Sequence, residues 1–268
     1  MDINLYRGNA NKIMCRFLKQ AIRELGIRVS SIDGGSLRNA IPREAFATVT
    51  IAKDKAENLK QMLTAYHGIV SAEYSIADPD LKIELAAADM PKSVMDEKNQ
   101  LALIDGVQAC PHEVFRMSDA MPGLVETSSN LAIVKAENGE ASVKCLMRSS
   151  VDTAKADLAS AMESIFRNLG AKCEFTGGYN GWKPNMNSAI LKTMKETYKK
   201  LYGKDAEIKA IHAGLECGIL SEPYPSWDMI SIGPTIRHPH SPDEKVKIDT
   251  VAKFWNFLVA VLKDAPAS

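Results

Sequence analysis

The sequence has no excess of charge of either sign and no long apolar run. Its 268 residues contain 33 Lys and Arg against 33 Asp and Glu. Proteins that bind nucleic acid or an anionic membrane surface present a basic face, so this balance argues against both partners. The longest apolar run near the C-terminus, residues 257–262, is far shorter than the roughly 20 residues that span a bilayer. Residues 1–7 also lack the apolar core of a secretory signal.

Cysteine and histidine are scarce, at five residues each. The cysteines are scattered, odd in number and form no CxxC motif, which is typical of reduced, mostly buried thiols in a cytosolic protein. The rest of the composition is ordinary, with 46% hydrophobic and 25% charged residues. These values predict a soluble, cytoplasmic, globular chain of about two domains.

Hydrophobic periodicity predicts alternating strands and helices in the first two thirds of the chain. We expect a strand at 3–6, a helix at 9–25 closed by Gly26, strands at 27–32 and 45–52, a helix at 54–66 and a strand pair within 72–87. The order is ferredoxin-like, and it partly recurs as a helix at 93–106, strands at 124–135 and 141–149, a helix at 153–169 and a strand at 171–175. Two ferredoxin-like halves side by side are therefore predicted. Such a region can serve as a binding or dimerisation module without chemistry of its own.

The remainder has an α/β pattern, so we expect an α+β domain at 1–174 followed by an α/β segment at 175–268. Helices are predicted at 186–202 and 248–262, the start of a short helix at 214–220, and short apolar strands at 207–211 and 229–232. A loop with three prolines, residues 233–246, follows the second strand and displays His238 and His240. Ligands collect at the carboxyl ends of strands in open α/β sheets. On this evidence alone a loop histidine can be a metal ligand, an acid or base, or a structural residue.

Three other stretches contain candidate binding groups, although each is a weak signal by itself. Residues 34–45 place Asn39 between two arginines in a glycine-rich loop. Arg148 lies at the end of a strand, and its planar fork suits the terminal carboxylate of a peptide. The turn at 212–218 puts small residues, Gly214 among them, at a helix N-terminus, where free N–H groups favour an anion.

Five motifs together resemble those of one enzyme family. They are Gly-Gly-Ser-Leu-Arg-Asn-Ala-Ile-Pro-Arg-Glu at 34–44, Met-Arg-Ser at 147–149, Gly-Tyr-Asn-Gly-Trp-Lys-Pro-Asn at 178–185, His-Ala-Gly-Leu-Glu-Cys-Gly at 212–218 and His-Ser-Pro-Asp-Glu-Lys-Val at 240–246. In this order they resemble the aminoacyl-histidine dipeptidases, which belong to the carnosinase-like di-zinc metallopeptidases. One departure is Ser36, where the family has threonine.

The resemblance implies a function and a role for each candidate. The family hydrolyses Xaa-His and other unblocked dipeptides with two zinc ions. His240 would ligate one zinc, Asn39 and Arg148 would hold the substrate carboxylate, and the Gly214 backbone would touch substrate. Residues 1–174 would form the lid, without its opening strand, and 175–268 the last part of the catalytic domain.

The family's catalytic groups and remaining zinc ligands would lie upstream of Met1. We therefore expect no catalytic residue in this chain, no activity of the chain alone, and an incomplete zinc site. A homodimer is possible. The alternative from another functional class is a non-catalytic ferredoxin-like interaction module.

Overall fold

The computed structural model describes residues 3–178, 180–183, 185–209, 216–238 and 243–265. The chain forms two compact units. Unit 1 comprises Met1–Met117 and Val125–Gly177, and unit 2 comprises Ser118–Leu124 and Gly178–Ser268. Each unit has its own hydrophobic cluster.

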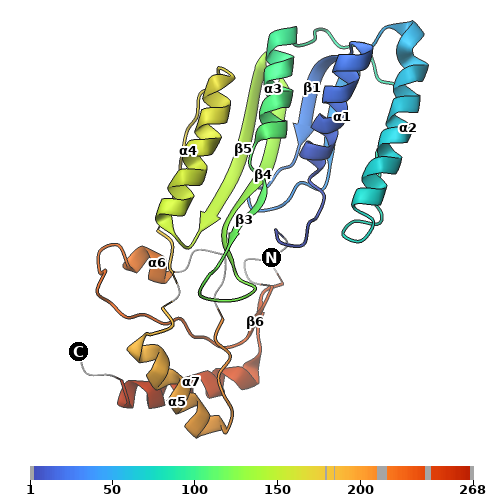
Figure 1. Cartoon of the computed structure of the whole chain (residues 1–268). Helices are drawn as coiled ribbons and strands as arrows, with labels where there is room; N and C mark the ends of the chain where they lie inside the picture. Colours follow the sequence, from blue (N-terminus) through green and yellow to red (C-terminus); the bar gives the residue numbers. More distant parts are fainter. Residues whose placement is uncertain (1–2, 179, 184, 210–215, 239–242, 266–268) are drawn as a thin grey trace. The chain divides into compact units, whose positions relative to one another are not determined.

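Unit 1 consists of helices packed on an antiparallel sheet (Figure 1). Its elements are α1 (Ala10–Leu25), β1 (Arg28–Gly34), β2 (Ala45–Thr50), η1 (Lys53–Lys55), α2 (Ala56–Glu73), α3 (Glu97–Ala109), β3 (Glu113–Met117), β4 (Val125–Glu137), β5 (Glu140–Ser149) and α4 (Asp152–Asn168). The predicted mixed α/β fold class is confirmed.

Strand β4 is the longest strand of the sheet and organises it. Along one edge it pairs with β5 from Thr127 to Glu137. Its other edge is shared, because β3 pairs with residues 125–129 and β1 with residues 134–136. Strand β2 then pairs with β1. The hairpins β1–β2 and β4–β5, one from each half of the unit, are thereby joined in one sheet.

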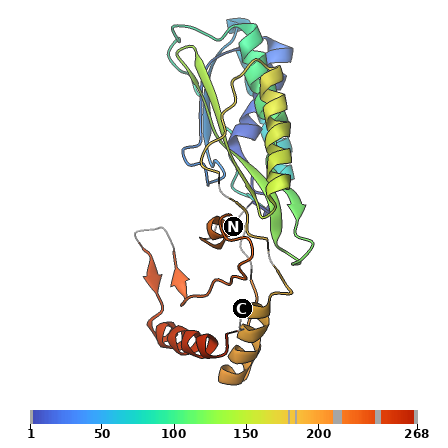
Figure 2. The same cartoon turned by 90° about the vertical axis from the view of Figure 1, so that its left-hand side faces the viewer.

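Helices α1, α3 and α4 cover one face of this sheet, as Figures 1 and 2 show together. Helix α1 begins at Asn9, whose side-chain oxygen accepts from the Lys12 amide at 3.1 Å, and ends at Gly26 in the left-handed region. It buries Cys15, Leu18 and Ala21, whose three-residue spacing puts them on one side of the helix. The apolar periodicity of the sequence predicted this helix correctly.

The prediction of an outer strand at 3–6 and at 171–175, one in each ferredoxin-like half, is wrong. Residues 3–6 form turns, and 171–175 pair with no strand in the part of the chain that the structure describes. Helix α2 continues to Glu73, and the Asp-Pro pair at 78–79 then turns the chain. Beyond it Leu81 and Ile83 pack against the core and have no sheet partner among the described residues, so their apolar character is explained by burial and not by a strand. The short strand β3 was not predicted.

Unit 2 contains two long helices and little sheet. Its elements are α5 (Ala189–Tyr202), α6 (Glu216–Leu220), β6 (Ile236–Arg237), β7 (Lys245–Val246) and α7 (Ile248–Lys263). Helices α5 and α7 meet at a small cluster around Met194, Phe257 and Val261. The predicted strands at 207–211 and 229–232 are wrong within residues 207–209 and 229–232, because no strand runs beside either of them in the part of the chain that the structure describes.

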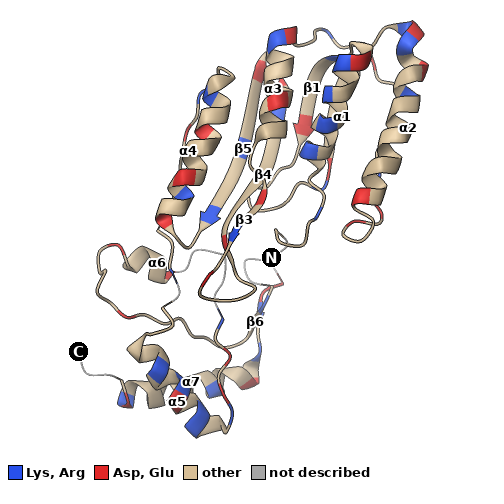
Figure 3. Ribbon diagram, viewed as in Figure 1, with Lys and Arg blue, Asp and Glu red and all other residues tan. Residues whose placement is uncertain are grey.

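Both signs of charge occur on α1, α3 and α4, so these helices present a mixed and not a basic surface (Figure 3). Each helix in the described part of the chain is too short or too polar to cross a bilayer.

Candidate substrate-binding site

The segment 34–44, which comprises the last residue of β1 and the loop that joins β1 to β2, is held close against β4. Gly35 has φ +74°, and a side chain there would overlap the carbonyl oxygen of Ala132. The carbonyl of Pro42, itself buried, accepts from the Ala10 amide at 3.1 Å. The loop is therefore fixed at both of its ends by backbone contacts.

Asn130 on β4 fixes the middle of the same loop. Its side-chain amide nitrogen donates to the carbonyl oxygens of Arg38, at 3.1 Å, and Ala40, at 2.8 Å. Asn130 is buried, whereas Asn39, which lies between the two carbonyls, is exposed. One buried amide thus holds the backbone on both sides of Asn39 and leaves the Asn39 side chain accessible.

Arg148 lies near the end of β5, on the same face of the sheet as Asn130. Arg148 is directly opposite Ser128, and Leu146 is opposite Asn130. Directly opposed residues of an antiparallel pair project to one face, and so do residues two apart on one strand. The intervening Met147 packs into the core with the helices. Arg148, Asn130 and the loop that carries Asn39 therefore share the face without helices.

A partly buried histidine, His112, lies just before β3 and supports β4. The Leu131 amide donates to Nδ1 of His112 at 3.2 Å, and the Asn9 side chain donates to the Leu131 carbonyl at 2.8 Å. Burial, and secondly the Lys12 ammonium, lower the pKa of His112 to about 4. His112 is thus a neutral hydrogen-bond acceptor at pH 7 and has a structural role.

Asn130 and His112 are residues that sequence reasoning missed. A signal for Asn130 was available, because residues 126–130 are polar in a strand whose following residues, 131–134, are apolar. Polar side chains within a buried strand need hydrogen-bond partners. Here the partners of Asn130 are backbone carbonyls of the 34–44 segment. His112 gave no such signal, since its neighbours in sequence have no ligand spacing.

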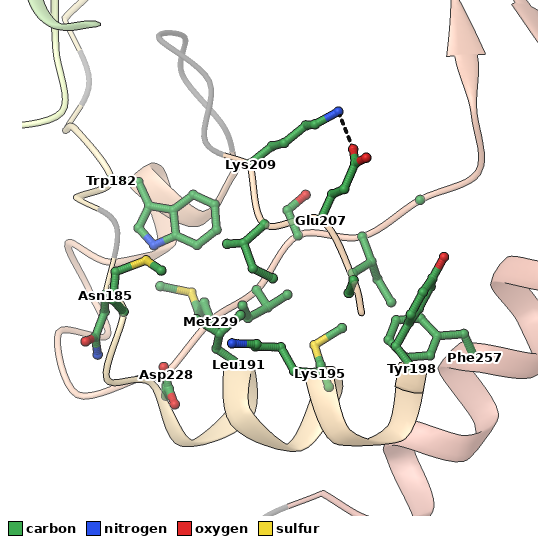
Figure 4. Close-up of a pocket in the computed structure, with 18 of the residues that line it drawn as sticks. Trp182, Asn185, Leu191, Lys195, Tyr198, Glu207, Lys209, Asp228, Met229 and Phe257 are labelled. Carbon is green, nitrogen blue, oxygen red and sulfur yellow. Dashed lines mark ion pairs between the residues drawn. The ribbon is translucent and has the colours of Figure 1, made fainter. Parts of the chain in front are cut away.

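Unit 2 contains a cavity of about 920 Å³. Helix α5 contributes Leu191 and Tyr198 to its wall, and helix α7 contributes Phe257. The extended residues 206–209 and 229–233 and the side chain of Trp182 also line it (Figure 4). Glu207 and Lys209 form an ion pair at 2.7 Å. The Asp228 carboxylate accepts from the Ile190 amide at 3.0 Å. Two of the cavity's acids are thus already engaged.

The described residues do not form a metal site. Among them, no group of three or more His, Cys, Asp and Glu side chains could hold a metal ion. His238 is exposed and has φ +52° at the end of β6. His240 and Gly214, the predicted zinc ligand and substrate contact of this unit, lie outside the described residues. Of the predicted site residues, the described geometry places Arg148 and the loop that carries Asn39 on one face of unit 1.

Comparisons with known proteins place these observations in a family context. Residues 4–78 match the family model of the peptidase dimerisation domain. Over 266 residues, 99% of the chain, the sequence is 42% identical to cytosol non-specific dipeptidase of Escherichia coli (strain K12). The crystal structure of aminoacylhistidine dipeptidase from Vibrio alginolyticus matches 100% of the chain with a TM-score of 0.93 and 42% identity.

In both comparisons the chain spans 55% of the length of the other protein. The resemblance predicted from the five motifs is confirmed by sequence and by structure. Over almost all of its length, the chain is similar to a little more than half of an aminoacylhistidine dipeptidase.

Proposed function

We propose that the chain is part of a cytosolic di-zinc dipeptidase that hydrolyses Xaa-His and other unblocked dipeptides. The observation that carries this proposal is that Arg148 and the Asn39 loop lie on one face of unit 1, in a chain 42% identical to a dipeptidase. Residues 1–174 act as the lid, and 175–268 contribute to the catalytic domain.

The residues of this chain bind and orient substrate. The guanidinium of Arg148 donates two parallel hydrogen bonds to the free carboxylate of the dipeptide. The Asn39 amide donates to the same carboxylate, and the Gly214 backbone contacts the substrate. A free C-terminal carboxylate is therefore the feature that the site selects.

Zinc, when bound, would polarise the scissile carbonyl and activate a water molecule. Whether these residues fit zinc depends on how many ligands the chain can supply. A zinc site needs three or more protein ligands, and only His240 is proposed as one. The described residues contain no group of three suitable side chains. We derive no catalytic step through zinc from these residues, and we propose that these 268 residues alone are inactive.

The test is to join the chain to the part of cytosol non-specific dipeptidase that it does not cover, and to assay hydrolysis of an Xaa-His dipeptide. The joined protein should cleave the free dipeptide and should cleave its C-terminal amide poorly. His240→Ala should abolish activity, whereas His238→Ala, two residues away, should have a small effect. Full activity of the His240→Ala variant would refute the ligand assignment.

A non-catalytic dimerisation module is the second candidate, favoured by the match of residues 4–78 to the peptidase dimerisation domain. A homodimer fits either function. If the isolated chain is a dimer in analytical ultracentrifugation and the joined protein never hydrolyses dipeptides, the module is the better description.

A further inference from the structure

Two cysteines from distant parts of unit 1 lie side by side in its core. Cys110 follows the last turn of α3, and Cys145 lies in β5. Their sulfur atoms are 3.5 Å apart, and both thiols are free. Cys110 is 1% exposed, whereas Cys145 is partly exposed. A disulfide requires the sulfurs to approach to about 2.05 Å, so a movement of roughly 1.5 Å would close the pair.

A partly buried cation, Lys12, lies beside this pair. The Lys12 ammonium donates to the carbonyl oxygens of Gln108, at 2.8 Å, and Cys110, at 2.6 Å. Its position at the end of α3 is therefore fixed by two hydrogen bonds. A thiolate, and not a thiol, is the reactive nucleophile of cysteine, and a nearby cation stabilises it.

The hydrogen bond between the two thiols also favours ionisation of one of them. Donation from the Cys145 S–H lowers the pKa of Cys110, against the effect of burial, and the charge of Lys12 acts in the same direction. The third thiol of this region behaves differently, because burial raises the pKa of Cys15 to about 12. Cys15 is therefore a matched control within the same core.

We propose that Cys110 and Cys145 form a reversible thiol–disulfide modification site that reacts with hydroperoxides. The inference is independent of the proposed function, because it rests on the geometry of the two thiols and Lys12. It adds to the sequence interpretation, in which the five cysteines were expected to be reduced, mostly buried thiols.

The reaction has two balanced steps with hydrogen peroxide as the oxidant. The thiolate of the pair attacks one peroxide oxygen, the O–O bond breaks, and hydroxide leaves and takes up a proton to form water. The resulting sulfenic acid is attacked by the second sulfur, the S–S bond forms, the S–O bond breaks, and a second water leaves with the remaining thiol proton. Two thiols and one peroxide thus give one disulfide and two waters.

The disulfide would join the end of α3 to β5, three residues before Arg148. Cys145 and Arg148 project to opposite faces of the strand, because their positions differ by three and side chains alternate between the two faces. The crosslink is therefore on the helix-covered face and leaves the Arg148 face open.

The test treats the folded 268-residue chain with hydrogen peroxide, blocks the remaining thiols with an alkylating reagent, and maps the peptides by mass spectrometry. We expect one crosslinked peptide pair that contains Cys110 and Cys145, and a fall in alkylated cysteines from five to three. Dithiothreitol should restore all five. Cys15→Ser should keep the crosslink, whereas Cys110→Ser and Cys145→Ser should each abolish it.

Peroxide treatment of the chain without substitutions is enough to overturn the proposal, whether or not the variants fold. Peroxide that leaves all thiols free, or that gives sulfinic acids without a crosslink, would show that the pair is only core packing. A crosslink that forms as fast in concentrated urea as in the folded chain would show that the folded geometry does not bring about the reaction.

Discussion

Replacing Gly35 with alanine tests how tightly the 34–44 loop is held on β4. Gly35 has φ +74°, and this conformation costs an alanine about 1–2 kcal/mol. The added methyl group would also overlap the carbonyl oxygen of Ala132, which belongs to the central strand and cannot move easily. Overpacking of this kind costs about 1–3 kcal/mol. We therefore expect Gly35→Ala to lower the free energy of unfolding of unit 1 by about 2–5 kcal/mol.

Gly139→Ala is the matched control. Gly139 has φ +82° in the turn between β4 and β5, and a side chain there meets nothing within 4 Å. This substitution carries the backbone cost alone, about 1–2 kcal/mol. Urea unfolding followed by far-ultraviolet circular dichroism gives both values, and their difference isolates the contact with Ala132.

The contact can also be relieved by movement of the loop. In that case trypsin should cleave Gly35→Ala faster after Arg38 and Arg43 than it cleaves the Gly139→Ala chain. Equal losses of stability and equal cleavage in the two variants would refute the close approach of the loop to β4.

Three further predictions concern binding, acid stability and the two units. In the joined dipeptidase, Arg148→Lys should lower kcat/KM for free dipeptides roughly ten- to a hundredfold, because one ammonium cannot replace a bidentate fork and a lost charged hydrogen bond costs about 1.5–3 kcal/mol; unchanged kinetics would remove Arg148 from the site. The lowered pKa of His112, about 4 in the folded chain, means that only the unfolded chain binds this proton between about pH 6.5 and pH 4. Stability should therefore fall on acidification through that range, by at most about 3 kcal/mol, and His112→Gln should flatten this dependence in urea titrations. Unit 2 should unfold at lower urea than unit 1, since its cluster has three buried residues, and hydrogen exchange equal to that of unit 1 would count against this. The unfolding of unit 2 can be followed separately by tryptophan fluorescence, because all three tryptophans, Trp182, Trp227 and Trp255, belong to unit 2.

The helices of unit 1 were predictable because their local signals agree with their burial. Asn9 and Gly26 begin and end α1, and its buried positions follow the helical period. The strand pair expected within 72–87 failed for the opposite reason. Leu81 and Ile83 are apolar because they pack against the core, and periodicity alone cannot show whether a hydrogen-bonding partner lies beside an extended segment.

For the candidate site, the sequence identified individual residues but not their arrangement in space. Asn39 and Arg148 were identified from motifs that resemble a known family, while bare composition gave each only a weak signal. Their placement on one face depends on the register of β4 with β5 and on the hydrogen bonds from Asn130, which connect residues about 90 positions apart. Such long-range pairings are a property of the folded chain and leave no local pattern in the sequence.

The most direct test of the account is the zinc content of the purified 268-residue chain, measured by dialysis and elemental analysis beside the joined protein. We predict weak, substoichiometric zinc and no dipeptide hydrolysis for the chain alone, and about two tightly bound zinc ions with activity for the joined protein. Stoichiometric tight zinc together with dipeptide turnover by the chain alone would contradict the account, because a complete catalytic site would then exist within these residues.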